Sequence, residues 1–213
     1  MVEMQNDVSK LSCTMLKLQL RLLESGEHVF PWLDHVRTLL DNLGLTYLWN
    51  RQSLSLNAFK MLIKQRLRDQ FIQTWSDDVN NNNICFNYRM YKKDFNFESY
   101  LINLDHPLRS SMMKFRFSNH KLPIQSQRFI GIERDERVCE ICDTGEIGDE
   151  FHYLFKCKDA RIVCERNKCL SKYYLQRPNV IKYHSIMNVK SVIKQRKLSR
   201  FIEFILKLFR GNA

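Results

Sequence analysis

The sequence predicts a mainly α-helical protein that carries one small metal-binding element. Apolar residues recur at intervals of three and four over most of the chain, which is typical of amphipathic helices. Six glycines and four prolines in 213 residues argue against a collagen-like or disordered chain, and 44 % hydrophobic residues suffice for a core. Three cysteines and one histidine fall within nineteen residues. We therefore expect a bundle-like helical domain, a zinc-stapled loop or hairpin, and a basic amphipathic C-terminal helix.

The N-terminal region, residues 1–79, is expected to hold three helices. The first covers residues 8–24 and the third runs from about residue 55 to residue 75, each with an apolar stripe at helical spacing. The second begins at Pro31, a favourable first helical residue, and stops at Gly44.

A run of four asparagines, residues 80–83, predicts a polar loop and the clearest break in the chain. The next region, residues 84–130, is aromatic and basic, and a helix opens in it at Pro107. Aromatic rings interleaved with cations either stack bases or form a helix-packing layer, and packing is the commoner outcome. The rings and cations concerned are Tyr88, Tyr91, Phe95, Phe97 and Tyr100 with Arg89, Lys92 and Lys93.

The third region, residues 131–170, contains the pattern C-x2-C-x9-H-x4-C, formed by Cys139, Cys142, His152 and Cys157. Zn2+ prefers four nitrogen and sulfur ligands in a tetrahedron, and a C-x2-C turn lets two thiolates converge. Glycines between the two ligand pairs permit the chain to reverse. We expect one structural Zn2+ per chain, with the second ligand pair beginning a helix. A scatter of buried free cysteines is the alternative.

The last region, residues 171–213, predicts a helix at about 186–209 with an apolar face and a basic face. Such a helix suits a membrane surface, a partner groove, or docking on the core with the basic face exposed, and we expect the last.

The formal net charge of +11 indicates a polyanionic partner. Nucleic acid is favoured over a membrane surface. Residues 1–10 lack the features of a secretory leader, and no apolar run is long enough to span a membrane. We therefore expect a reducing intracellular compartment, the nucleus or the cytoplasm. The remaining cysteines are expected to be buried thiols, although replacement of Cys157 as a ligand by Cys164 or Cys169 stays open. They are Cys13, Cys85, Cys164 and Cys169.

Two segments resemble the zinc-binding C-terminal region of non-LTR (LINE-type) retrotransposon reverse transcriptases. The first runs from KFRFSNHKLPI, starting at Lys114, to Arg128, and the second comprises DERVCEIC and GDEFHYLFKC, ending at Cys157. The resemblance implies that the four residues of the pattern are metal ligands. It also implies a role in holding template RNA or target DNA beside a polymerase core.

Motifs for catalysis are missing from this stretch of sequence. The adjacent pair Asp77-Asp78 follows helical sequence and lacks the strand–turn–strand setting of a polymerase carboxylate pair. A catalytic zinc would need an open coordination position and a nearby carboxylate base, and Glu150 is close in sequence. Four well-spaced ligands, three of them thiolates, fit a closed structural site better. We therefore expect a protein that is not an enzyme.

The sequence favours a non-enzymatic, zinc-containing module that binds RNA or single-stranded DNA. A helical adaptor that docks a protein or an anionic membrane is the alternative from another class, and a zinc hydrolase or nuclease is the third. The expected phosphate-contacting residues are Lys114, Arg116, His120, Lys121 and Arg128 near the site, and Lys194, Lys197 and Arg200 on the terminal helix.

Overall fold

The computed structural model describes residues 11–50 and 54–209, and these residues are mainly helical, as predicted. Among them no β-strand occurs, and the single β-bridge joins Val138 to Ile147 in antiparallel fashion. The early helices are α2 (Leu11–Glu24), α3 (Pro31–Asn42), α4 (Tyr47–Asn50), α5 (Leu56–Asn81), α6 (Phe86–Tyr91), α7 (Tyr100–Asn103) and α8 (His106–Arg116). The later helices are α9 (Pro123–Phe129), α10 (Ala160–Cys169), α11 (Lys172–Leu175), α12 (Val180–Met187) and α13 (Val192–Leu208).

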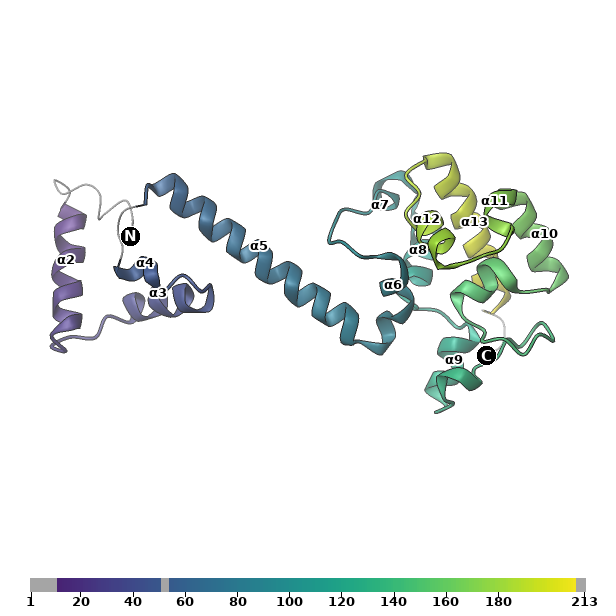
Figure 1. Ribbon diagram of the computed structural model, residues 1–213, viewed down its shortest axis with the longest axis horizontal. Coiled ribbons are helices and arrows are strands. Elements are labelled where there is room, and N and C mark those ends of the chain that lie inside the picture. Colours follow the sequence, from purple (N-terminus) through teal and green to yellow (C-terminus); the bar gives the residue numbers. More distant parts are fainter. Residues whose placement is uncertain (1–10, 51–53, 210–213) are drawn as a thin grey trace. The chain divides into compact units, whose positions relative to one another are not determined.

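The chain divides into two compact units, of which unit 1 ends at Trp75 and unit 2 begins at Ser76 (Figure 1). This boundary falls inside α5. The predicted polar loop at residues 80–83 is wrong in part, because α5 continues into it. The last turn of α5 includes Asn80 and Asn81. Only then does the chain break, where the Asn82 side chain accepts a hydrogen bond from the Ile84 amide at 2.9 Å and begins the 3-10 turn η1 (Asn83–Cys85).

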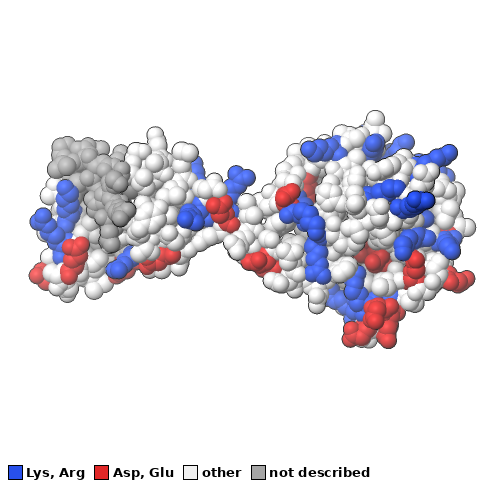
Figure 2. Space-filling view, in the orientation of Figure 1, with Lys and Arg blue, Asp and Glu red and all other residues white. Residues whose placement is uncertain are grey.

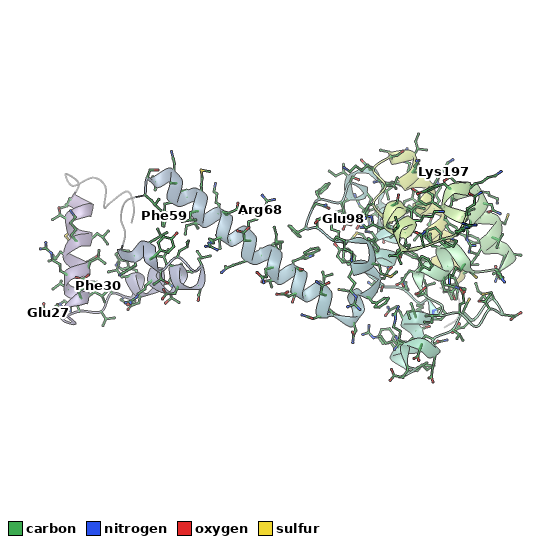
Figure 3. All side chains as sticks on the ribbon, viewed as in Figure 1. Glu27, Phe30, Phe59, Arg68, Glu98 and Lys197 are labelled. Atoms are coloured by element: carbon green, nitrogen blue, oxygen red, sulfur yellow. The ribbon has the colours of Figure 1, made fainter. Side chains whose placement is uncertain are left out.

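Unit 1 has a small leucine core, formed by Leu40, Leu43, Leu45 and Leu48. Helix α3 begins at Pro31 and is followed by Gly44 in the left-handed region, with φ +67°, which confirms the predicted start and stop. Phe59 of α5, labelled in Figure 3, packs against this core.

Unit 2 is organised around α13, which packs mainly on α8 and also on α10 (Figure 1). Its inner face is buried, and the Ser199 hydroxyl donates a hydrogen bond to the Leu108 carbonyl at 2.7 Å. The buried apolar residues of α13 are Leu198, Phe201, Ile202, Ile205 and Leu206. The basic helix is therefore docked on the core, as predicted, although Ile193 in its first turn is 70 % exposed.

Arg116 is the largest fully buried side chain of unit 2, 1 % exposed, and it centres a group of charges that we call the Arg116 cluster (Arg116, Glu98, Lys92, Tyr91 and Tyr100). Its Nε lies 2.9 Å from Glu98 Oε2, and Lys92 Nζ lies 3.1 Å from Glu98 Oε1. The guanidinium carbon lies 4.4 Å and 5.0 Å from the ring centroids of Tyr91 and Tyr100.

The predicted phosphate contact of Arg116 is incompatible with this burial. A guanidinium group enclosed by a carboxylate and two aromatic rings is shielded from any polyanion outside the fold. Tyr91 and Tyr100 are buried in the same layer, so for these rings packing, rather than base stacking, is confirmed. Burial raises the pKa of Glu98, but Arg116 and Lys92 outweigh this effect and lower it overall.

Among the described residues, no helix is both long enough and apolar enough to cross a bilayer.

Candidate metal centre

The first ligand pair lies in a short hairpin-like turn. The Cys139 amide donates to the Glu146 carbonyl at 2.9 Å, and the Gly148 amide donates to the Arg137 carbonyl at 2.8 Å. These bonds flank the Val138–Ile147 bridge and hold Cys139 and Cys142 on one tight loop.

Two glycines allow this turn, for different reasons. Gly145 has φ +65°, in the left-handed region that glycine adopts at little cost. Gly148 is needed because of close packing, since a Cβ there would lie 3.0 Å from the Pro123 Cβ and 3.1 Å from the Cys139 Cα. The prediction that the glycines let the chain reverse holds for Gly145, whereas Gly148 lets the hairpin approach α9.

The second ligand pair lies on a π-helical turn, η3 (His152–Lys156), and not on the continuous helix that we expected. The Asp149 carboxylate accepts from the His152 amide at 2.8 Å and begins the turn. The Cys157 amide then donates to the His152 carbonyl at 2.8 Å, an i→i+5 bond. In an α-helix, residues five apart point about 140° away from each other. The wider π turn returns Cys157 to the side of His152, and α10 starts only at Ala160.

The four predicted ligands converge. One ligand atom from each of Cys139, Cys142, His152 and Cys157 lies within 4.8 Å of all the others. Cys139, His152 and Cys157 are buried, and Cys142 is partly exposed. Three sulfurs and one imidazole in a group of this size can hold a metal ion such as zinc.

Glu146 orients the histidine, a role that our sequence reasoning missed. Its carboxylate lies 3.0 Å from His152 Nδ1, which leaves Nε2 facing the sulfurs, 3.3 Å from Cys142 Sγ. A carboxylate on the far ring nitrogen is the usual support of a metal-bound histidine. Burial raises the pKa of Glu146, but Lys156, at 3.1 Å, and His152 lower it overall. An acid in the loop between two ligand pairs is the sequence signal that points to this role.

Hydrogen bonds among the ligands shift their pKa values. A hydrogen bond from the Cys157 thiol lowers the pKa of Cys139, and the same bond raises the pKa of Cys157. Burial opposes protonation of His152, but bonds to Cys139 and Glu146 outweigh it and raise its pKa to about 9. A metal ion would replace these protons, so its binding would release them.

Arg166 of α10 supports the π turn from behind. Its guanidinium donates to the carbonyls of Phe155 at 2.9 Å, Cys157 at 2.8 Å and Tyr153 at 3.3 Å. These carbonyls lack partners within a continuing helix because the chain leaves the helical path at Cys157. The buried arginine thus replaces the missing turn.

Glu150 joins the metal segment to the loop after α8. It is buried and accepts hydrogen bonds from Ser118 Oγ at 2.6 Å and from His120 Nε2 at 2.9 Å. The Leu122 amide donates to His120 Nδ1 at 3.3 Å, so Nε2 carries the proton. The His120 side chain is only 2 % exposed, which is incompatible with the predicted phosphate contact.

The other predicted phosphate-contacting residues lie at the surface in separate places. Lys114 lines a depression formed by α8 and the chain after it, and Lys121 is exposed and Arg128 partly exposed. On α13, Lys194, Lys197 and Arg200 are all exposed. Two of these, Lys194 and Lys197, line one pocket together with Lys168 of α10, which sequence reasoning did not single out. Figure 2 shows Lys and Arg spread over the part of unit 2 that contains α10–α13, whereas Asp and Glu gather near α9.

The remaining cysteines are not the buried thiols that we expected. Cys164 is exposed, and Cys85 and Cys169 are partly exposed. The side chain of Cys13 lies outside the described part of the chain. Neither Cys164 nor Cys169 belongs to the metal-ligand group, whose sulfurs are those of Cys139, Cys142 and Cys157.

Comparison of the chain with protein-family models, with curated proteins and with solved structures gives no match.

Proposed function

We propose that this chain is a non-enzymatic nucleic-acid-binding module stapled by one structural Zn2+. The observation that carries the proposal is the Cys3His cluster with its glutamate. Cys139, Cys142 and Cys157 supply soft sulfur ligands, and Glu146 directs the lone pair of His152 Nε2 toward them. This donor set favours zinc over hard cations such as Mg2+ or Ca2+. A chain that keeps three thiols free for a metal suits a reducing intracellular compartment.

The zinc would be structural because four protein ligands leave no position for a reactive water. Glu150, the nearest candidate for a general base, is buried and engaged by Ser118 and His120. Its carboxylate therefore braces the fold and is not free to take a proton from a metal-bound water. This arrangement supports the proposal that the module is not an enzyme.

Nucleic acid is the proposed partner because of the net charge of +11 and the exposed cations of α13. Lys194 and Lys197 form no ion pair with any residue that the structure describes, so both are free to neutralise phosphates. Binding to RNA or single-stranded DNA would then depend strongly on salt and weakly on sequence.

The resemblance to the C-terminal region of LINE-type reverse transcriptases suggests the larger assembly in which the module would act. Its two segments, residues 114–128 and residues 135–157, are joined by the bonds of Glu150 to Ser118 and His120. This coupling supports reading them as one module. In that setting the module would hold template RNA or target DNA beside a reverse transcriptase core.

Zinc content tests the metal part of the proposal. We expect about one zinc ion per chain in protein purified under reducing conditions, and less in Cys142→Ser. Cys164→Ser is the matched control, because Cys164 is exposed and outside the cluster. Circular dichroism before and after chelation should show loss of structure in the wild type. Absence of zinc from fully reduced, purified wild-type protein would refute the metal part of the proposal.

Salt-dependent binding tests the nucleic-acid part. Each lost phosphate contact should reduce the slope of log K against log salt by about 0.7 for a single strand. We expect such reductions for Lys194→Ala and Lys197→Ala. Lys207→Ala is the control on the same helix, because Lys207 is paired with Glu203 at 2.9 Å. Sedimentation with anionic liposomes, together with no binding to nucleic acid, would instead select a membrane-docking adaptor.

A further inference from the structure

A pocket of about 200 Å3 lies in unit 2, lined by residues from the end of α10 to the middle of α13. Its most buried lining residues are apolar: Leu170, Ile186 and Leu198 are 7 %, 3 % and 1 % exposed. Val189, Tyr174, Ser171 and Cys169 also line it. Pockets for drug-sized ligands are usually about 300–1,000 Å3, so this one suits a single small ring system.

Three lysines complete the lining of this pocket. Lys168 comes from α10, and Lys194 and Lys197 from the first turns of α13, where Figure 3 labels Lys197. Lys168 Nζ is paired with Glu165 Oε1 at 2.5 Å, whereas the other two have no acidic partner among the described residues. The pocket therefore combines an apolar interior with uncompensated positive charge.

Tyr174 supplies an aromatic wall. It is partly exposed, and its ring packs edge-on against Tyr173, with centroids 5.1 Å apart. Its hydroxyl has only a weak contact with Ser185 Oγ, at 3.4 Å. A ring held in this way offers a stacking surface to a flat ligand, and every nucleobase has such a face.

We propose that this pocket takes one unpaired nucleobase of single-stranded RNA or DNA, stacked against Tyr174, with Lys194 and Lys197 holding the adjoining phosphates. A flat, largely apolar ring beside an anion is the chemistry that the lining complements. The inference rests on the proposed function, because it assigns a place for the bases of a strand whose phosphates attract the basic helix. Paired bases in a duplex are excluded, because they stay stacked inside the helix.

The first test compares two oligonucleotides of equal length, oligothymidylate and an abasic strand, on the full zinc-loaded chain. Both carry the same phosphates, but only the first has bases. We expect the wild type to prefer oligothymidylate by about tenfold. Tyr174→Ala should remove this preference and leave abasic affinity unchanged, and Tyr174→Phe should keep it. Tyr173→Ala is the matched control, because Tyr173 is 60 % exposed and does not line the pocket.

A second measurement uses the wild type alone and is independent of any folding defect in the variants. Cys169 lines the pocket, so a bound base should slow its alkylation, followed by peptide mass spectrometry. Cys85, which is also partly exposed but lies in η1 and does not line the pocket, should react at an unchanged rate. Protection of Cys169 by oligothymidylate and not by the abasic strand supports the inference.

Equal affinity of the wild type for the two strands, or equal effects of Tyr174→Ala and Tyr173→Ala, would overturn the pocket and leave the proposed function standing. Protection of neither cysteine by a bound strand would do the same. Absence of binding to both strands would instead refute the proposed function, and the pocket assignment with it.

Discussion

The Cys3His cluster and the Arg116 cluster are both groups of polar side chains inside unit 2, but their charges are compensated differently. In the Arg116 cluster, the carboxylate of Glu98 lies between Arg116 and Lys92, at 2.9 Å and 3.1 Å. Both cations also have neutral partners: Lys92 Nζ donates to the Asn96 carbonyl at 2.7 Å and Arg116 donates to the Met187 carbonyl at 2.6 Å.

The sulfurs of the Cys3His cluster have a neutral partner in Thr144, whose Oγ1 lies 3.2 Å from Cys142 Sγ, but no Lys or Arg side chain that the structure describes bonds to them. The buried guanidinium nearest to them, that of Arg166, donates to backbone carbonyls and not to sulfur. Hydrogen bonds within the cluster lower the pKa of Cys139 and raise the pKa of His152. The charges of the Arg116 cluster are therefore compensated within the chain, whereas the three sulfurs and the imidazole of the Cys3His cluster could hold a metal ion such as zinc.

Removal of the metal should have the largest effect. Cys139→Ser with chelator should destabilise unit 2 by more than about 5 kcal/mol, because zinc binding contributes about 10–16 kcal/mol to the folding of small zinc modules. The free energy of unfolding, from urea titrations followed by circular dichroism, measures it. Cys164→Ser should behave as the wild type. If chelator treatment left the stability of the wild type unchanged, the Cys3His cluster would not depend on a metal ion, and it would not differ from the Arg116 cluster in this respect.

Arg116→Met should cause the second-largest loss of stability. Removing one member of a buried ion pair leaves Glu98 undercompensated and costs about 3–5 kcal/mol. The same urea titration measures the loss, and zinc content should stay unchanged, since the two clusters share no side chain. Arg109→Met is a matched control, since Arg109 is only partly buried and donates to the Leu101 carbonyl. Reduced salt dependence of nucleic-acid binding by folded Arg116→Met would mean that this side chain reaches phosphate after all.

Glu146→Gln should weaken metal binding by about 10–100-fold, as expected for loss of a carboxylate that supports a ligand histidine. Competition with a zinc-binding dye measures the affinity. Glu140→Gln is the control, because Glu140 is exposed and bonds to Gln127 at 2.9 Å, outside the cluster. Equal affinities of the two variants would show that His152 needs no orienting partner.

Alanine at the two hairpin glycines should have the smallest effects. Gly148→Ala should cost about 1–3 kcal/mol from overpacking against Cys139 and Pro123. Gly145→Ala should cost about 1–2 kcal/mol for a different reason, the left-handed φ of +65°. Thermal melts of the zinc-loaded variants compare them. Asparagine at position 145 should restore part of the stability, whereas at position 148 it should be worse than alanine.

Much of this arrangement could be predicted because it depends on local sequence. Helix starts such as Pro31 and the C-x2-C turn are set by a few neighbouring residues, and the metal ligands all fall between residues 139 and 157. Periodicity also predicts the terminal helix, although the segment is divided into α12 and α13 rather than being continuous from residue 186.

The two phosphate contacts that are wrong, those of Arg116 and His120, concern residues whose partners are distant in the chain. Arg116 looked like a surface cation within a basic segment, but it contacts Glu98 and Met187, 18 and 71 residues away. His120 likewise meets Glu150 across the hairpin. Charge alone gives no information on burial when the neutralising group comes from another element. The π turn was missed because a five-residue ligand spacing fits several backbone paths.

The π turn at residues 152–156 also bears on how the length of this segment can change. It has one residue more than an α-helical turn needs to return to the same side. Deleting one residue between His152 and Cys157 would leave the ligands four apart, a spacing that an ordinary α-helix presents on one face. Inserting one residue would separate them by six, which neither helix type brings back. The metal segment should therefore tolerate shortening by a residue and reject lengthening, an asymmetry imposed by backbone geometry on insertions and deletions.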